Sequence, residues 1–227
     1  MKIGILQAGH APDAMRPETG DYADLFKRLL GDHDFDFVTY DVVDMQFPEG
    51  PDAADGWLIT GSKHGSYEDL PFIAPLETFV RDVYAAGVPM VGICFGHQIV
   101  AQALGGRVEK FGGGWAVGRQ TYDWQGEPVA LNAWHQDQVT EIPEGAQIVA
   151  RNDFCKNAAL VYGDRIFTVQ AHPEFENAFV KELGIVRGKG VVPDNLLEAA
   201  RAVSLEPVDS KRVADQMARF LRTRSLS

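Results

Sequence analysis

One segment of the chain, residues 88–98, constrains the fold most, because it joins an apolar run to a helical pattern through a cysteine between two glycines. The segment reads VPMVGICFGHQ. An apolar run bounded by turn residues is typical of a buried strand, and apolar residues at helical spacing follow it. Glycine at 92 and 96 indicates a turn in which side chains would clash with the chain or with a substrate. The segment therefore predicts a strand, a tight turn carrying Cys94, and a helix.

The position of Cys94 indicates a nucleophile. The first amides of the following helix have no intrahelical partners, and together with the helix dipole they favour a thiolate over a thiol. A thiolate is the species that attacks a carbonyl carbon. The alternative is an inert, buried cysteine that serves only packing. Two flanking glycines at a strand-to-helix turn favour the nucleophile.

A partner for this cysteine occurs far downstream, where residues 167–174 read FTVQAHPE. Pro173 biases His172 toward extended backbone, and residues two apart in an extended chain point the same way. The side chains of His172 and Glu174 are therefore expected to lie together. An imidazole moves protons in acyl transfer, and a carboxylate on its other nitrogen orients it. By itself His-Pro-Glu is most simply a surface turn; with the cysteine turn it indicates catalysis.

The motifs GICFGHQ at 92–98 and HPE at 172–174 together resemble those of the class I (triad) glutamine amidotransferase family, over nearly the whole chain. The resemblance implies that Cys94 is the nucleophile, His172 the general base and acid, and Glu174 the residue that orients His172. It implies a γ-glutamyl thioester that forms with release of ammonia or an amine and is hydrolysed to glutamate. No cofactor is expected for this chemistry.

The resemblance extends to a candidate oxyanion hole, the set of amides that stabilises the developing negative charge. Residues 56–62, GWLITGS, resemble the family's oxyanion strand and loop, and the amide of Phe95 is expected to join them. The family often carries Gly-Gly-Pro where this chain has Gly61-Ser62-Lys63. Gly61 and Ser62 therefore both stay candidates for the second amide.

Two further stretches resemble the family's substrate-binding residues. Gln98 lies one helical turn after Cys94 on the same face, and in the family this glutamine holds the glutamyl portion. Residues 134–139, WHQDQV, resemble the segment that lines the substrate's α-amino and α-carboxylate end, which implicates His135, Gln136 and Asp137. The alternative for this segment is a polar turn between strands.

Strand and helix patterns alternate through the first half of the chain. Strands are expected at Lys2–Gln7, Asp36–Tyr40, Gly56–Thr60 and Val88–Ile93, and helices at Tyr22–Leu30, Leu76–Ala86 and Phe95–Leu104. This alternation predicts an α/β fold, a three-layer α/β/α sandwich with a mostly parallel, doubly wound sheet of flavodoxin type. Ligands of such sheets bind beyond the carboxyl ends of the strands, where Cys94 and the Gly61-Ser62 loop fall.

The pattern changes after residue 106, where short strands separated by turn residues predict a small antiparallel extension. They are expected at Arg107–Lys110, Pro128–Leu131, Gln147–Arg151, Ala158–Tyr162 and Ile166–Val169. Helices follow at Asp194–Val203 and Ser210–Arg222. The chain is expected to form one domain over residues 1–227. Two loops are candidates for specificity: Gly9–Gly20 at the active end of the sheet, and the glycine-rich Phe111–Gly118 as a flexible wall over Cys94. Arg16 is either a cation for a substrate carboxylate or, more simply, a solvated loop residue.

Composition narrows the functional class. A net charge of −11 and a pI of about 4.9 argue against direct binding of nucleic acid or of an anionic membrane surface. No apolar run is long enough to span a bilayer, and the six histidines lack the spacing of metal ligands. A disulfide between the two cysteines, Cys94 and Cys155, would consume the proposed nucleophile, so a reducing, cytoplasmic location is expected.

Three functions agree with these motifs. The first is a glutamine amidotransferase that supplies ammonia to a synthetase partner subunit. The second is a stand-alone γ-glutamyl peptidase or hydrolase acting on a small γ-glutamyl compound, since the same motifs are also similar to those of plant-type γ-glutamyl peptidases. The third is a regulatory or binding protein that uses the same fold without catalysis, which the presence of Cys94, His172 and Glu174 disfavours.

Overall fold

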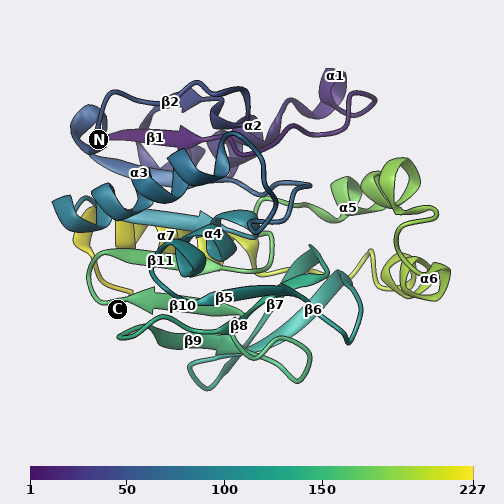
Figure 1. Cartoon of the computed structure of the whole chain (residues 1–227). Helices are drawn as coiled ribbons and strands as arrows, with labels where there is room; N and C mark the ends of the chain where they lie inside the picture. Colours follow the sequence, from purple (N-terminus) through teal and green to yellow (C-terminus); the bar gives the residue numbers. More distant parts are fainter. Residues whose placement is uncertain (227) are drawn as a thin grey trace.

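Five parallel strands form one half of a nine-stranded sheet in the computed structural model, which describes residues 1–226. They are β1 (Lys2–Leu6), β2 (Asp36–Tyr40), β3 (Gly56–Ile59), β4 (Met90–Ile93) and β11 (Ile166–Val169). The spatial order β2-β1-β3-β4-β11 brings the last of them next to the strand that precedes Cys94 (Figure 1). The predicted parallel α/β sheet is confirmed.

The sheet continues with antiparallel strands, as the turn-rich second half of the sequence predicts. Beyond β11 lie β10 (Ala159–Tyr162), β9 (Gln147–Arg151), β6 (Ala116–Trp124) and β7 (Glu127–His135). The strands β5 (Arg107–Lys110) and β8 (Asp137–Glu141) form a separate antiparallel pair. The sequence prediction omits β6 and β8 and shortens β7. A glycine with φ of 74° at 118 interrupts the pattern of β6, and pairing with β7 makes it a strand regardless.

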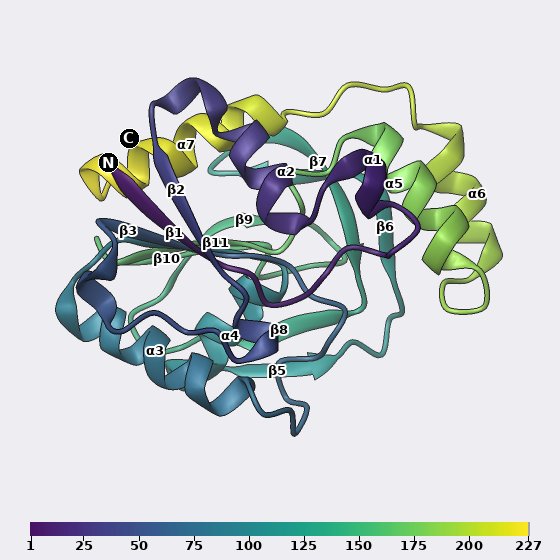
Figure 2. The same cartoon turned by 90° about the horizontal axis from the view of Figure 1, so that it is seen from above.

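Helices cover both faces of the sheet, and each face has its own apolar core (Figure 2). One face carries α2 (Tyr22–Leu29) and α7 (Ser210–Thr223), and the other carries α3 (Ile73–Ala86) and α4 (Phe95–Ala103). Trp57 is fully buried on the second face, and a Cβ at Gly4 would lie 2.2 Å from its ring. Because position 4 is a glycine, the indole of Trp57 can pack directly against β1.

Residue chemistry explains two of the helix ends, and a third end departs from expectation. Asp21 caps α2 in a reciprocal capping box with Asp24, and Gly87 ends α3 with φ of 69°. Asp209, which precedes α7, does not cap it; one of its carboxylate oxygens accepts a hydrogen bond from the amide of Ala130 at 2.8 Å. That bond fastens the start of α7 to β7.

The other α-helices and one π-helical turn gather at the edge where the parallel strands end (Figure 1). They are α1 (Arg16–Thr19), α5 (Asn177–Leu183), a π-helical turn at Gly184–Gly188, and α6 (Asp194–Ala202). Neither α5 nor the π-helical turn is predicted from the sequence, because seven residues give little periodicity and no side chain caps α5. Within residues 1–226, none of the helices combines the length and the apolar character that a membrane crossing requires.

The packing of α7 gives a test of the fold. Phe220 is fully buried, with its ring centroid 5.9 Å from that of Phe167 on β11. We expect Phe220→Ala to lower the free energy of unfolding by about 3 to 5 kcal/mol, because it leaves a cavity in the core. The exposed neighbour variant Arg219→Ala should change it by less than about 0.5 kcal/mol in the same denaturant titrations. Equal effects would contradict this placement of α7.

Candidate active site

The turn between β4 and α4 holds Cys94 in an unusual backbone conformation, with φ of 53° and ψ of −101°. The surroundings make this geometry obligatory. A Cβ at Gly92 would lie 2.5 Å from the carbonyl oxygen of Gly96, and a Cβ at Gly96 would lie 2.5 Å from that of Ile59. The amide of Cys94 donates to the carbonyl of Val169 at 2.8 Å. Positive φ in a residue with a side chain is strained and is held here by the packed turn.

His172 and Glu174 lie together after β11, as the sequence predicts. Nδ1 of His172 is 2.7 Å from Oε1 of Glu174, and both side chains are buried. The His172 ring stacks flat on Phe175, with centroids 3.9 Å apart and an interplanar angle of 1°. Cys94 and His172 line the same cavity, and a Cβ at Gly61 would lie 2.9 Å from Cε1 of His172 and 3.7 Å from Cβ of Cys94. The structure therefore brings the three residues of the expected triad into one connected group.

Asn132 on β7 holds the segment that carries His172. The amide of His172 donates to the carbonyl of Asn132 at 2.8 Å. The side-chain amide of Asn132 donates to the carbonyl of Phe175 and to the side-chain oxygen of Asn177 on α5, both at 2.9 Å. One buried side chain thus links β7, the turn with His172, and the start of α5.

Electrostatics favour a protonated His172. Burial by itself would lower the pKa of this imidazole, but the charges of Glu174 and Cys94 and the hydrogen bonds to both raise the pKa to about 10. His172 is therefore an imidazolium at neutral pH. This is the partner that a cysteine thiolate requires, and the proton it carries is available to a leaving group.

The candidate oxyanion amides lie near Cys94, in the segments that follow the neighbouring strands β3 and β4. At Gly61, after β3, a Cβ would lie 2.9 Å from Cε1 of His172 and 3.7 Å from Cβ of Cys94, so this position accepts only a bare backbone. Ser62 lines the cavity next to Cys94. Phe95 is the first residue of α4, where amides lack intrahelical acceptors.

An open cavity of about 450 Å³ lies over Cys94, at the carboxyl ends of the parallel strands. Seven residues proposed from the sequence line it: Ser62, Cys94, Gln98, His135, Gln136, Asp137 and His172. Gly61, Phe95 and Glu174 lie behind its wall. Among residues 1–226, no group of three or more His, Cys, Asp and Glu side chains is placed to hold a metal ion.

Hydrogen bonds order the far end of this cavity. The side-chain amide of Gln98 donates to the carbonyl of Asp137 at 3.0 Å and to the side-chain oxygen of Gln170 at 3.1 Å. Nδ1 of His135 lies 3.1 Å from the same carbonyl, and burial lowers the pKa of His135 to about 4, so its ring is neutral. Burial also raises the pKa of Asp137, against the opposing effect of a hydrogen bond from Tyr67.

Sequence reasoning missed much of the cavity wall. The missed residues come from α2, the loop after β3, β5, the turn after β11, α5, and the π-helical turn with the residues after it: Tyr22, Lys63, His64, Gly65, Tyr67, Glu68, Lys110, Phe175, Leu183, Arg187 and Val191. Trp115 and Trp134 also line the cavity, and both lie in segments that the sequence analysis singled out. The loop after β3 had a usable signal, since loops at the carboxyl ends of parallel strands form ligand sites. The other missed residues carry no local signal.

One loop expectation needs correction. No residue of Gly9–Gly20 lines the cavity; Arg16–Thr19 form α1, and the partly exposed Arg16 pairs with Asp13 and Asp21. In Phe111–Gly118, expected as a wall over Cys94, Trp115 does line the cavity, and the last three residues belong to β6, which pairs with β7. The second cysteine, Cys155, is buried, and burial raises its pKa to about 12, which agrees with a structural role.

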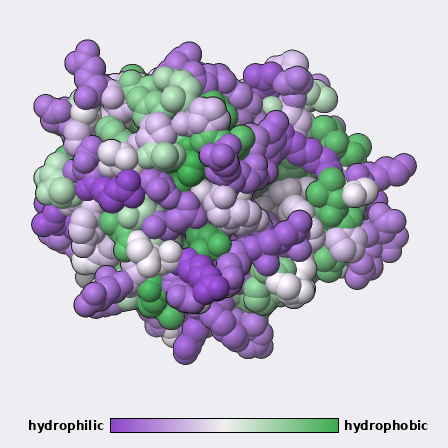
Figure 3. Space-filling view, in the orientation of Figure 1, coloured by the Kyte–Doolittle hydropathy of each residue, from purple (hydrophilic) through white to green (hydrophobic). Residues whose placement is uncertain are grey.

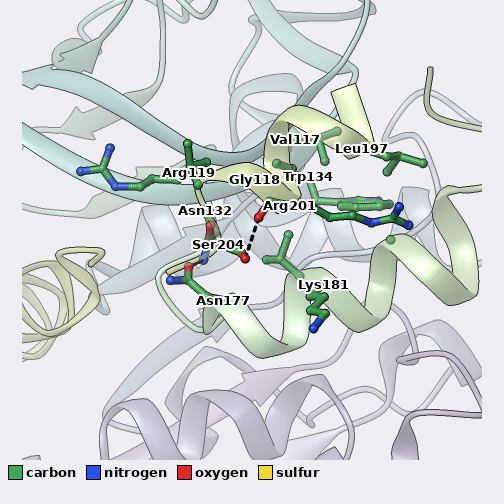
Figure 4. A pocket seen from close by; sticks show the side chains of 14 residues that line it. Val117, Gly118, Arg119, Asn132, Trp134, Asn177, Lys181, Leu197, Arg201 and Ser204 are labelled. Atoms are coloured by element: carbon green, nitrogen blue, oxygen red, sulfur yellow. Dashed lines mark hydrogen bonds between the residues drawn. The ribbon is translucent and has the colours of Figure 1, made fainter. Parts of the chain in front are cut away.

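A second, much smaller cavity of about 20 Å³ lies between β6, β7, α5 and α6 (Figure 4). Its wall includes Asn132, Trp134, Arg119 and Ser204, and its volume suits about one water molecule. Trp134 lines both cavities, so a single indole separates them. No cysteine lines the small cavity, which lies within the packing of α5 and α6.

Comparison with known proteins agrees with this geometry. The chain belongs to the class I glutamine amidotransferase family, whose model matches residues 38–179. It is 30% identical over 200 residues to γ-glutamyl peptidase 4 of Arabidopsis thaliana, covering 81% of this chain and 80% of that protein. It is 33% identical over 165 residues to a subunit of the glutamine-hydrolyzing GMP synthase of Halobacterium salinarum, covering 68% of this chain and 84% of that protein.

Solved structures share the fold. The crystal structure of a glutamine amidotransferase from Methylobacillus flagellatus superposes with a TM-score of 0.72, covering 99% of this chain and 92% of that one, at 23% sequence identity. The α/β fold with its central, mostly parallel sheet is thus the fold of the family.

The crowding around the Cys94 turn can be tested directly. We expect Gly96→Ala to lower the free energy of unfolding by about 1 to 3 kcal/mol, because the methyl group would meet the carbonyl oxygen of Ile59. The matched control is Gly112→Ala, where a Cβ would meet no atom within 4 Å and the change should stay within about 0.5 kcal/mol. Thermal and denaturant unfolding of both variants measures the difference; a tolerated Gly96→Ala would refute the close approach.

Proposed function

We propose that the protein is a thiol hydrolase of γ-glutamyl amides, with Cys94, His172 and Glu174 as its catalytic triad. The observation that carries the proposal is a cysteine at a strained turn that shares a cavity with a buried imidazole, whose Nδ1 lies 2.7 Å from a carboxylate oxygen. The cavity is large enough for a small-molecule substrate. A nucleophile, a proton carrier and an orienting acid are the parts that acyl transfer needs.

In the first half-reaction the Cys94 thiolate attacks the γ-carbonyl carbon of the substrate. The developing oxyanion is stabilised by the amide of Phe95 and by an amide of the Gly61-Ser62 loop. The C–N bond then breaks, and the His172 imidazolium gives its proton to the departing nitrogen. The products of this step are a γ-glutamyl thioester on Cys94, a free amine or ammonia, and a neutral His172.

In the second half-reaction His172 accepts a proton from water, and the resulting hydroxide attacks the thioester carbonyl. The C–S bond breaks, glutamate leaves, and the Cys94 thiolate and His172 imidazolium are restored. Glu174 keeps Nδ1 of His172 oriented through both steps and stabilises its charge. This chemistry needs no cofactor.

The glutamyl portion of the substrate is proposed to lie toward Gln98 and the segment His135–Asp137. Gln98 lies one turn from Cys94, and its amide is fixed by Asp137 and Gln170. Glu68 and Asp137 supply carboxylates for an α-ammonium group, and Lys63 and Lys110 supply ammonium groups for an α-carboxylate. An amino acid zwitterion matches this mixed wall.

γ-Glutamyl peptides or conjugates are the favoured substrates, because the cavity continues past the triad along an aromatic wall and a relative is a γ-glutamyl peptidase. The second candidate is glutamine, with ammonia passed to a synthetase partner subunit. The similarity to a GMP synthase subunit favours this second role. Glutamate release from glutamine and from a γ-glutamyl dipeptide by the purified protein alone separates the two.

Substitutions in the triad test the chemistry. Cys94→Ala should lower kcat for glutamate release by about 10³-fold or more, because it removes the nucleophile. Glu174→Gln should be milder than His172→Ala by roughly 10-fold or more, since glutamate orients the base and transfers no proton. Cys155→Ala is the matched control and should keep its turnover. Normal turnover by a folded Cys94→Ala variant would refute the mechanism.

The raised pKa of His172 predicts the pH dependence. An ordinary histidine loses its proton around a pKa of 6.5. In the folded protein the His172 imidazolium persists through neutral pH and is lost as pH rises through about 10. We therefore expect kcat/KM for a γ-glutamyl dipeptide to persist through neutral pH and to fall on the alkaline side. Glu174→Gln removes the carboxylate charge and should move that fall to lower pH. If kcat/KM fell at the same alkaline pH in the wild type and in Glu174→Gln, the assignment of this fall to His172 would be contradicted.

A further inference from the structure

We propose that Arg187 and the aromatic side chains next to it form a subsite for the leaving group, which selects γ-glutamyl amides of apolar or aromatic amino acids with a free carboxylate. The inference rests on the proposed γ-glutamyl hydrolase function and names the class of amine released. Its components come from α2, from the region after β11 and from the π-helical turn, and no sequence motif indicates them.

The position of His172 determines which side of the cavity holds the leaving group. Since His172 gives its proton to the departing nitrogen, the leaving group must lie on the His172 side of Cys94, away from Gln98 and Asp137. Phe175 stacks on His172, and the ring of Tyr22 lies 6.1 Å from that of Phe175. Tyr22 lines the same cavity as Cys94 and His172.

Aromatic and aliphatic side chains form this side of the cavity. Trp134 and Trp115 make an edge contact with ring centroids 6.4 Å apart, and both face the cavity. Leu183 and Val191 complete the wall. In the segment that follows α5, Ile185 and Val191 are 55% and 60% exposed. Figure 3 shows hydrophobic side chains gathered over α5 and this segment, beside a hollow in the surface. Such a surface favours an apolar ligand over water.

Arg187 supplies the charge at this end. Its guanidinium lies 3.4 Å from the Tyr22 hydroxyl, and it takes part in none of the ion pairs formed among residues 1–226. Tyr22 is buried and its phenol is neutral, so it accepts one hydrogen bond without neutralising the cation. A guanidinium carries five N–H donors in a fork that matches a carboxylate, and most of these are left for a ligand.

Glutamine would leave this end of the cavity unused, because its leaving group is ammonia, which has neither an apolar side chain nor a carboxylate. An amino acid released from a γ-glutamyl dipeptide has both. Its amine lies at His172, its side chain lies against Trp134 and Trp115, and its carboxylate pairs with Arg187. The amine, the side chain and the carboxylate are all attached to the same α-carbon, so one released amino acid makes all three contacts.

The test compares γ-glutamylphenylalanine with its C-terminal amide, in which the carboxylate charge is removed and the ring is kept. The wild-type protein should prefer the free acid in kcat/KM by roughly 10- to 100-fold, the range of a hydrogen bond to a charged group. Arg187→Gln should lower kcat/KM for the free acid by roughly 10- to 100-fold more than for the amide, and so abolish this preference. Lys189→Gln, which removes an exposed charge two residues away, is the matched control and should keep the preference.

A binding measurement separates this inference from the proposed function. Calorimetry on the Cys94→Ala protein should show tighter binding of the free acid than of the amide, and Arg187→Gln in the same background should remove the difference. Cys94-dependent cleavage with no preference for the carboxylate, or equal losses for acid and amide in Arg187→Gln, would overturn the subsite and leave the hydrolase standing. Carboxylate-dependent binding without turnover of either compound by the wild type would overturn the hydrolase and leave the subsite standing.

Discussion

The parallel pairing of β4 with β11 is the interaction on which the rest of the site depends. Ile93 lies opposite Val169 in this pair, and the ladder extends one residue further, where the amide of Cys94 donates to the carbonyl of Val169. This register places Cys94 and the turn with His172 at the same edge of the sheet, although 77 residues of sequence intervene between the two. A shift of one residue would turn every side chain of one strand to the opposite face.

The strained turn at Cys94 shows how this edge is built. Positive φ costs about 1 to 3 kcal/mol in a residue that has a side chain, and the surrounding contacts must offset it. They do so because α4 packs directly on β3 and β4, with glycine at 92 and 96 permitting backbone contact. The result is functional: the sulfur stands at the start of a helix, beside an imidazolium, facing an open cavity.

Local chemistry decided what could be predicted. The parallel strands, the Asp21 cap and the glycine at 87 carry their signals within a few residues, and so do the Cys94 turn and the His172–Glu174 pair. The wall around Tyr22 and Arg187 has no such signal, because its members meet only when the chain after β11 returns over α2. The strand β6 was missed for a related reason, since its pairing with β7 outweighs an interrupting glycine.

Asn132 has a consequence for how this site can change. The same side chain that fixes the turn of His172 is bonded to Asn177 at the start of α5, the helix that contributes Leu183 to the cavity and leads to Arg187. The proposed general base, His172, and the wall that would choose the amine are therefore linked through one side chain. A descendant of this protein could not exchange α5 freely to accept a new amine; it would have to keep an acceptor at position 177, or lose the alignment of its base.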